Sequence, residues 1–221
     1  MSFRPGARQF FEKRGAPTPP LPYDAEVEYL ESTGTQWIIT GIKPSVGDVY
    51  AVDTTVQYSQ NISNDTWLTG WYLGASNSSL IGVYARQIYF TYNLDGNIAK
   101  TSSGLHDKHH LQYNFPEGII IDGNVLSSSV AANTPLSVKP SGSYFTGIPI
   151  FSRYHGGGYS NAIKCKCFSF AILINGVVVF DGIPIRFTNE LNQSEGAMYD
   201  RVSGQLFRNA GTGAFLWAEK Q

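Results

Sequence analysis

The 221-residue chain is poor in charge, and this limits its partners. Charged residues make up 15% of the chain, against the roughly 25% that is usual in soluble domains. The formal net charge is −1. A protein that binds nucleic acid through the phosphates carries a strongly basic surface, which this composition does not supply. We therefore expect no nucleic acid among the partners.

Cysteine is also scarce, with only Cys165 and Cys167 in the chain. Two thiols do not make a disulfide-stapled secreted scaffold. On one strand they point to the same face, roughly 6–7 Å apart, which is at or beyond the usual limit for a disulfide. No second cysteine pair or nearby histidine completes a zinc site. We expect two buried or half-buried free thiols.

Long apolar runs are absent. No segment has 18 consecutive apolar residues, so we expect no membrane insertion. The basic N-terminus lacks an apolar core, because Phe10-Phe11 is followed at once by charged residues, and no Sec signal peptide is predicted. A phage structural protein, made in the cytoplasm and used outside it, fits this combination. A mature protein whose signal has been removed fits it too.

Signals of catalysis are missing as well. There is no Gly-x-Ser-x-Gly elbow, and the Gly156-Gly157-Gly158 run lacks the lysine and helix of a phosphate loop. Glycoside hydrolysis needs two facing carboxylates. Glu26 and Glu28 share a strand face but have no partnering aspartate, so we interpret them as solvated edge charges. Spacing alone does not exclude a Ser-His-Asp site. The prediction is a protein that is not an enzyme.

Aromatic residues and glycines are abundant, at 14% of the chain and 23 residues respectively. They favour strands joined by tight turns. Asp122-Gly123 and Asn175-Gly176 are strong signals for two-residue hairpin turns. No amphipathic helix of ten or more residues is evident, and after Pro184 we expect a loop and a short hairpin. We therefore predict an all-β sandwich or jelly roll, with strands near residues 26–30, 36–40, 50–58, 66–73, 80–84, 87–92, 110–114, 118–121, 125–129, 148–154, 162–174 and 177–180.

Residues 1–22 differ from the rest of the chain. The segment ends in a proline-rich stretch that favours extended backbone. It can be an anchor that docks into a larger assembly, or simply a disordered tail. Its basic residues, which outnumber the single acid Glu12, are Arg4, Arg8, Lys13 and Arg14.

Two segments resemble a known family. The first reads Glu28-Tyr29-Leu30-Glu31-Ser32-Thr33-Gly34-Thr35-Gln36-Trp37-Ile38, ending in Thr40-Gly41. The second reads Gly196-Ala197-Met198-Tyr199-Asp200 and continues through Val202, Gly204, Phe207 and 209–215. They are similar to the start and end of concanavalin A-like, laminin-G-like domains of gut-bacterial prophage and surface proteins. The resemblance spans Tyr23 to Trp217. Ile39 stands where relatives often carry Asp, and Met198 where Leu is usual.

The resemblance implies a two-sheet, concanavalin-like jelly-roll domain over residues 23–221. It also implies a non-enzymatic module of a phage virion, attached to capsid or tail, whose head binds host-surface or mucin glycans. Its partners would be other virion proteins, contacted through the N-terminal segment, and further copies of itself. The alternatives are a free carbohydrate-binding or adhesion module on the bacterial surface and, more distantly, a glycoside hydrolase.

The two end motifs themselves are interpreted as structural. Gly34, Gly204, Gly211 and Gly213 suit turns that need positive φ. Asp200, next to a glycine turn, is suited to capping backbone amides. We expect these residues to close strands of the sandwich and to form its chain termini.

Two patches combine aromatic and planar polar residues of the kind that bind sugars. The first is Asn64-Asp65-Thr66-Trp67 with Trp71 and Tyr72, for which core packing is the alternative. The second flanks the triple glycine, for which an ordinary flexible loop is the alternative. The predicted ligand-binding residues are Trp67, Trp71, Tyr72, Arg153, Tyr154, His155, Tyr159 and Asn161.

Histidines gather between His106 and His110, and a metal site is one interpretation. The other is a polar loop that enters a strand, where His109 and His110 would face opposite ways. Some laminin-G-like relatives bind calcium, but no aspartate-rich loop here suggests it. We predict no metal and no cofactor.

Overall fold

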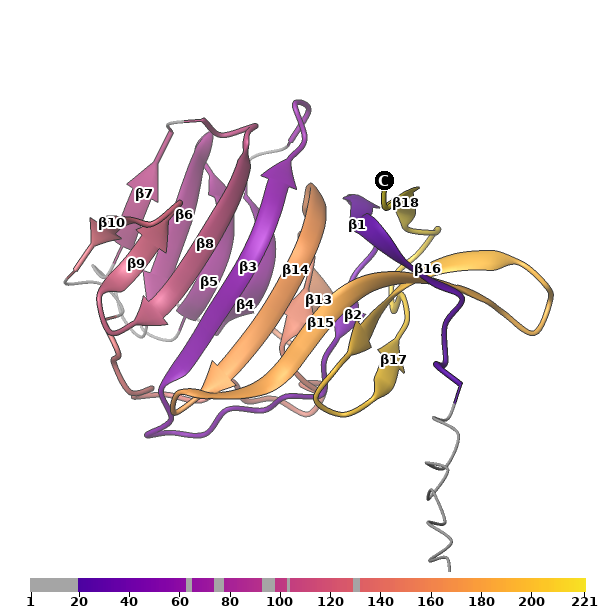
Figure 1. Cartoon of the computed structure of the whole chain (residues 1–221). Coiled ribbons are helices and arrows are strands. Elements are labelled where there is room, and N and C mark those ends of the chain that lie inside the picture. Colours follow the sequence, from indigo (N-terminus) through magenta and orange to yellow (C-terminus); the bar gives the residue numbers. More distant parts are fainter. Residues whose placement is uncertain (1–19, 63–64, 74–77, 93–97, 103, 129–131) are drawn as a thin grey trace, which may run out of the picture.

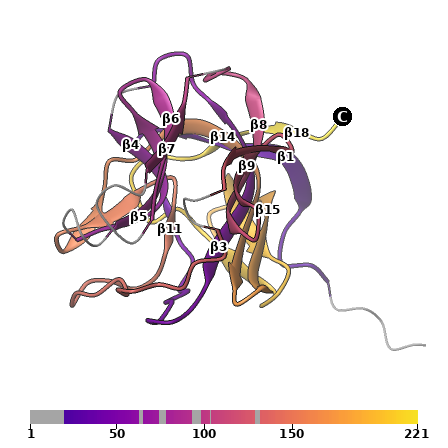
Figure 2. The ribbon, with the colours of Figure 1, turned by 90° about the vertical axis from the view of Figure 1, so that its left-hand side faces the viewer.

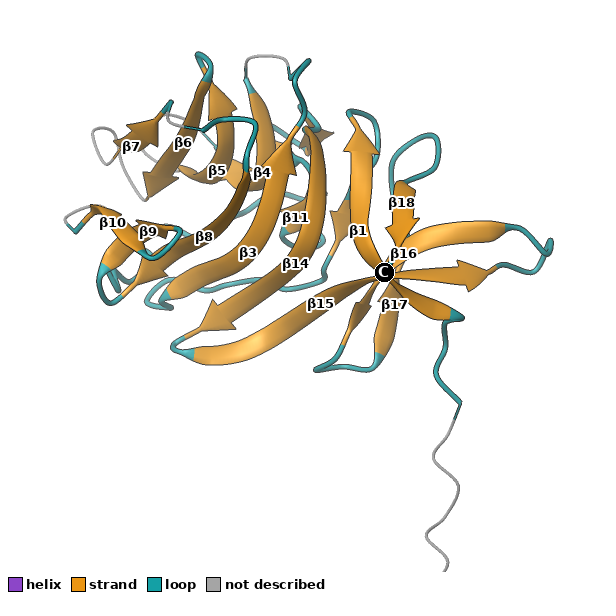
Figure 3. Ribbon diagram, turned by 45° about the horizontal axis from the view of Figure 1, so that its top comes forward, coloured by secondary structure: helices purple, strands orange, loops and turns teal. Residues whose placement is uncertain are grey.

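The protein is an all-β sandwich. In this computed structural model the described residues are 20–62, 65–73, 78–92, 98–102, 104–128 and 132–221. None of them lies in a helix, as the colouring of Figure 3 shows. Two sheets, antiparallel in nearly all their pairings, pack face to face, and Figure 2 shows the two layers edge-on. The prediction of an all-β, two-sheet sandwich is confirmed.

The larger sheet, sheet A, forms the front layer in Figure 1. Its order is β10-β9-β8-β3-β14-β1-β15-β16-β17, with β18 paired to β1. The strands are β1 (Ala25–Thr33), β3 (Tyr50–Tyr58), β8 (Lys108–Phe115), β9 (Gly118–Ile121), β10 (Asn124–Ser127), β14 (Lys164–Ile174), β15 (Val177–Thr188), β16 (Ser194–Asp200), β17 (Gln205–Phe207) and β18 (Leu216–Glu219).

The smaller sheet, sheet B, lies behind it in the order β13-β12-β4-β5-β6-β7, and β11 pairs with both β2 and β4. Its strands are β2 (Ile38–Ile39), β4 (Thr66–Tyr72), β5 (Ser78–Tyr84), β6 (Gln87–Tyr92), β7 (Ile98–Thr101), β11 (Pro149–Ile150), β12 (Arg153–His155) and β13 (Gly158–Ser160).

Alternating side chains build the core between the sheets. On β3, Val52, Val56 and Tyr58 are buried while Asp53 and Gln57 are partly exposed, which is the two-residue period of a strand with one solvated face. One continuous apolar cluster fills the space between the layers. Burial of apolar surface contributes about 25 cal/mol for each Å², so this cluster is the main source of stability.

The hairpin predictions are confirmed in detail. Asp122 and Gly123 have φ of 51° and 78°, and Asn175 and Gly176 have φ of 54° and 78°. Positive φ at both central residues is the signature of the type I′ turn, whose twist matches that of the flanking strands. These two turns join β9 to β10 and β14 to β15.

The prediction of a loop after Pro184 is wrong, because β15 continues to Thr188. The backbone N–H of Asp181 donates to Asp200 and its carbonyl accepts from Arg201, so both point toward β16. The carbonyl of Arg186 accepts from the amide of Asp24, on the opposite side of the strand. Alternation therefore turns the nitrogen of Pro184 away from β16. On that side of β15, the pairing with β14 ends at Gly182 and the pairing with β1 begins at Ile185. The nitrogen of Pro184 lies in the gap between them. Proline is tolerated there because no ladder bond is lost.

Beyond that point β15 and β16 form a hairpin that extends past the sandwich in Figure 1. Ile185, Phe187 and Ala197 make a second, small core on it. Tyr23 packs against this core, with its ring centroid 5.0 Å from that of Tyr199. The residues just before β1 are thereby fixed on the hairpin.

The two end motifs lie side by side in the structure. Thr35 and Thr212 exchange two hydrogen bonds, each 2.9 Å, and the amide of Trp37 donates to Asn209 Oδ1 at 3.2 Å. Gly34, Gly204 and Gly213 have positive φ, but Gly211 does not. A Cβ at Gly211 would lie 2.2 Å from the Thr35 carbonyl oxygen, so close packing requires that glycine.

Asp200 caps backbone amides, which confirms its prediction. Its carboxylate accepts from the amides of Asp181, Val202 and Ser203 at 2.7, 3.1 and 3.1 Å, and from the Ser203 hydroxyl at 2.6 Å. Burial alone would raise the pKa of Asp200, but these donors outweigh it and the net pKa is lowered.

Cys165 and Cys167 are free and fully buried on the core face of β14, as predicted. Burial raises the pKa of the Cys167 thiol to about 12 and also raises the pKa of the Cys165 thiol well above its usual value. Both therefore stay protonated and act as small apolar side chains.

Candidate functional site

The two predicted sugar-binding patches become one region through a strand pairing. β12 lies parallel to β4, which sets Tyr154 opposite Trp71 and His155 opposite Tyr72. The patches are about 80 residues apart in the sequence. Their meeting depends on this parallel pair, which local sequence signals do not reveal.

Two of the predicted residues point into the core. Trp71 is 1% exposed and Tyr154 is fully buried. The Trp71 ring packs against Tyr50 at 5.5 Å and the Tyr154 ring against Phe145 at 5.1 Å. The alternative of core packing therefore holds for Trp71, and neither side chain lies on the surface that a ligand would meet.

Tyr159 serves the local backbone. Its hydroxyl accepts from the amides of Thr146 and Gly147 at 3.0 and 3.2 Å and donates to the Gly147 carbonyl at 3.0 Å. Its ring packs edge-on against Tyr154 at 5.5 Å. The residue ties the β12–β13 hairpin to the segment before β11.

The remaining predicted residues gather on the outer face of sheet B. The guanidinium carbon of Arg153 lies 5.4 Å from the Trp67 ring centroid and 5.5 Å from that of Tyr72. His155 meets Tyr72 edge-on at 5.3 Å. A cation close to two aromatic rings is attracted by their electron-rich faces, which holds Arg153 in place.

Asp65 organises this group. Its Oδ1 accepts from Trp67 Nε1 at 2.8 Å and from Arg153 Nη1 at 3.2 Å. Asn161 Nδ2 donates to Oδ2 and to the Asp65 carbonyl, each at 2.9 Å. We call Asp65, Trp67, Tyr72, Arg153, His155 and Asn161 the Asp65 cluster. Asn64, which the sequence placed in the same patch, lies outside the described residues.

The cluster leaves Arg153 incompletely satisfied. Its side chain is 11% exposed, and Nε has no hydrogen-bond partner within the described part of the chain. Burial lowers the pKa of Arg153 more than the nearby Asp65 and Tyr72 raise it. The cation is therefore held in a partly dry position where an added acceptor would be favourable.

Sequence reasoning missed an aromatic extension of this face. Trp67 meets Tyr89 edge-on at 6.0 Å, and Tyr89 contacts Tyr84 at 5.3 Å. Tyr84 is 48% exposed, whereas Trp67 is only 3% exposed. A Cβ at Gly82 would lie 2.8 Å from the indole, so that glycine makes room for it. The signal was in the sequence, since Tyr84 and Tyr89 flank a predicted turn.

The histidine cluster does not converge, as strand geometry predicted. His109 is buried and lies 2.7 Å from both Asp122 Oδ2 and the Gly104 carbonyl oxygen, whereas His110 is exposed and contacts Asp53 at 2.7 Å. The described residues hold no group of three His, Cys, Asp or Glu side chains that could bind a metal ion. Burial raises the pKa of Asp122, but the hydrogen bonds and charges of His109 and His110 lower it by more. The net pKa is therefore below the usual value.

The predicted anchor residues Arg4, Arg8, Lys13 and Arg14 lie outside the described residues. Next to that segment, Asp24 accepts a 2.7 Å bond from the Thr188 hydroxyl and donates its amide to the Arg186 carbonyl. The N-terminal segment therefore joins the domain at the β15–β16 hairpin.

A search of the described residues finds no helix long and apolar enough to cross a membrane. Comparison of the chain with models of protein families, with curated proteins and with solved structures finds no match.

Proposed function

We propose that this chain is a non-enzymatic β-sandwich module that binds glycans through the Asp65 cluster. The observation that carries the proposal is the set of aromatic and planar polar side chains on one outer face. Sugar sites commonly combine an apolar ring face with a few fixed polar groups. Here Tyr72 and His155 supply the rings, while Arg153 and Asn161, held in place by Asp65, supply the polar edge.

The non-enzymatic part of the proposal is supported by the state of Asp65. Glycoside hydrolysis uses two carboxyl groups, one of which exchanges a proton with the leaving oxygen. The carboxylate of Asp65 accepts from Trp67, Arg153 and Asn161. Three protein side chains already bond to this carboxylate, which leaves little of it open to a substrate oxygen.

The test of binding is a glycan array with the full-length protein, followed by affinity measurements on variants. Tyr72→Ala should weaken binding about tenfold, equal to about 1.4 kcal/mol. Tyr72→Phe keeps the ring and should retain most of the affinity. The control is Leu191→Ala on the distant hairpin, where the side chain is 76% exposed. Equal affinity of Tyr72→Ala and the parent protein would overturn the proposal for this face.

We propose further that the protein is a laminin-G-like jelly roll carried on a phage particle, with residues 1–22 contacting another virion protein. The end motifs support the family and the basic character of the segment supports the contact. Mass spectrometry of purified particles should find the chain at fixed stoichiometry. Replacing Arg4, Arg8, Lys13 and Arg14 by Glu should remove it from particles without affecting glycan binding. Absence from particles but presence on cells would favour the free adhesion module.

A further inference from the structure

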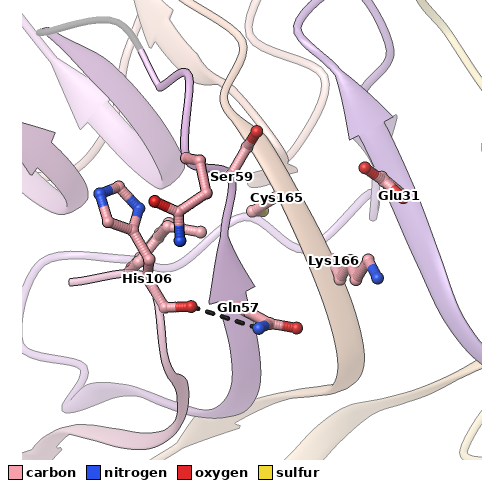
Figure 4. Close-up of a pocket in the computed structure, with 8 residues that line it drawn as sticks. Glu31, Gln57, Ser59, His106, Cys165 and Lys166 are labelled. Atoms are coloured by element: carbon pink, nitrogen blue, oxygen red, sulfur yellow. Dashed lines mark hydrogen bonds between the residues drawn. The ribbon is translucent and has the colours of Figure 1, made fainter. Parts of the chain in front are cut away.

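A polar pocket lies on the outer face of sheet A, on the opposite side of the sandwich from the Asp65 cluster (Figure 4). Its volume is about 200 Å³. Drug-sized ligands occupy pockets of roughly 300–1,000 Å³, so this one is on the scale of a single sugar ring. We call it the Glu31 pocket; its lining residues are Glu31, Gln57, Tyr58, Ser59, Gln60, His106, Cys165 and Lys166.

Strand register brings its polar side chains together. Glu31 on β1 is paired with Lys166 on β14, and Lys166 is paired with Gln57 on β3. Directly paired residues share a face, so the three side chains form a row across adjacent strands, as Figure 4 shows. His106 closes the row from the loop before β8, where its carbonyl accepts a 3.2 Å bond from Gln57 Nε2.

The opposite charges in this row do not form an ion pair. Lys166 Nζ instead lies 4.3 Å from the ring centroid of Tyr29, whose own ring packs edge-on against Phe168. Within the described chain the carboxylate of Glu31 has no hydrogen-bond or ion-pair partner. An ammonium has three donors, and the contact with one ring leaves some of them free. The pocket therefore displays a free anionic acceptor beside a cationic donor.

A buried nitrogen supplies a second, independent observation. His106 Nδ1 is inaccessible to solvent and has no hydrogen-bond partner within the described residues. A buried polar atom without a partner costs free energy, and native structures contain few of them. Because the atom is inaccessible to solvent, a ligand hydroxyl can satisfy it only if the His106 ring turns toward the pocket.

We propose that the Glu31 pocket binds one neutral sugar ring through two adjacent hydroxyl groups. One hydroxyl donates its hydrogen to the Glu31 carboxylate, and the oxygen of the adjacent hydroxyl accepts from the Lys166 ammonium. Both are charge-assisted hydrogen bonds. Gln57 presents its free carbonyl oxygen to the same ring. The site does not rest on the Asp65 cluster, since the two lie on opposite outer faces, and a protein with both could bridge two glycan chains.

The test is a titration of the full-length ¹⁵N-labelled protein with the methyl glycosides of glucose, galactose and mannose, followed by NMR. At least one glycoside should shift the amide signals of Glu31, Gln57 and Lys166. The deoxy analogue that lacks one hydroxyl of the bound pair should bind at least about tenfold more weakly. Shifts at Tyr72 and His155 alone would overturn this site and leave the Asp65 cluster intact.

Matched variants separate binding from folding. Glu31→Gln and Lys166→Met should each weaken the response at the pocket at least about tenfold. Glu28→Gln and Lys100→Met alter the same residue types at exposed positions outside the pocket and should leave it unchanged. Tyr72→Ala should also leave it unchanged. Unaltered binding in Glu31→Gln, or no shift in the pocket with any of the three glycosides, would overturn the proposal.

Discussion

Asp65 and Glu31 are carboxylates on opposite outer faces of one sandwich, and their surroundings differ sharply. Asp65 accepts hydrogen bonds from three side chains, whereas Glu31 accepts none within the described residues. The first uses its charge to hold a guanidinium and an indole in place. The second keeps its charge available. A saturated carboxylate shapes a surface and a free one can receive a ligand, so the same chemical group serves two purposes according to its neighbours.

Asp200 carries this comparison to its limit, because its carboxylate has four donors and the residue is 2% exposed. Asp200→Ala should lower the free energy of unfolding by about 2 kcal/mol, since three partly buried amides and one hydroxyl lose their acceptor. Urea denaturation followed by circular dichroism measures it. A loss below about 1 kcal/mol would show that water replaces the carboxylate.

Asp65→Asn should have the next largest effect. The variant keeps the shape and tolerates the φ of 56° at this position, but Arg153 loses its counter-ion. We expect a loss of about 1–2 kcal/mol, because the largely buried guanidinium is left without an opposite charge. Thermal unfolding gives the stability, and tryptophan fluorescence reports on Trp67. An unchanged melting temperature would contradict the role assigned to Asp65.

Acid should reduce stability through the carboxylates whose pKa is depressed. For Asp122 and Asp200 the folded state binds a proton less readily than the unfolded chain, for which the usual pKa is 3.8. Their contribution is complete above about pH 5, begins to fall as the pH approaches the unfolded value, and is lost once the pH drops below the folded pKa. Urea midpoints between pH 7 and pH 3 measure it. The acid decline should be shallower in Asp122→Asn; an identical decline would assign it to other groups.

Glu31→Gln should have the smallest effect on stability, within about 0.5 kcal/mol, because the side chain makes no bond that the change removes. The same urea denaturation measures it. A loss as large as that of Asp65→Asn would erase the contrast between the two carboxylates and give Glu31 a structural role.

Strand positions and turns were largely predictable because they follow local rules. Period-2 alternation marked β3 between Tyr50 and Tyr58, and the Asp-Gly and Asn-Gly pairs located two type I′ hairpins. The continuation of β15 past Pro184 was not predictable in this way. It depends on the gap between the pairing of β15 with β14 and its pairing with β1. The sequence of β15 alone does not reveal which strands lie beside it.

The candidate site divides in the same manner. The sequence identified Trp67, Tyr72, Arg153, His155 and Asn161 because aromatic and planar polar residues gather near glycines. It also included Trp71 and Tyr154, which the structure buries. Alternation shows which residues share a face, but not which face meets the core, and a shift of one residue exchanges the two. The Glu31 pocket was not found, because its residues come from separate strands and a loop.

By itself the sequence determined the all-β class, the two-residue hairpin turns at Asp122-Gly123 and Asn175-Gly176, and the free thiols, because each follows from composition or from neighbouring residues. Only the tertiary structure decided that β12 lies beside β4, that Asp65 is saturated while Glu31 is free, and that the two candidate sites face opposite ways. Those outcomes depend on pairings between residues far apart in the chain, which packing of the whole core selects.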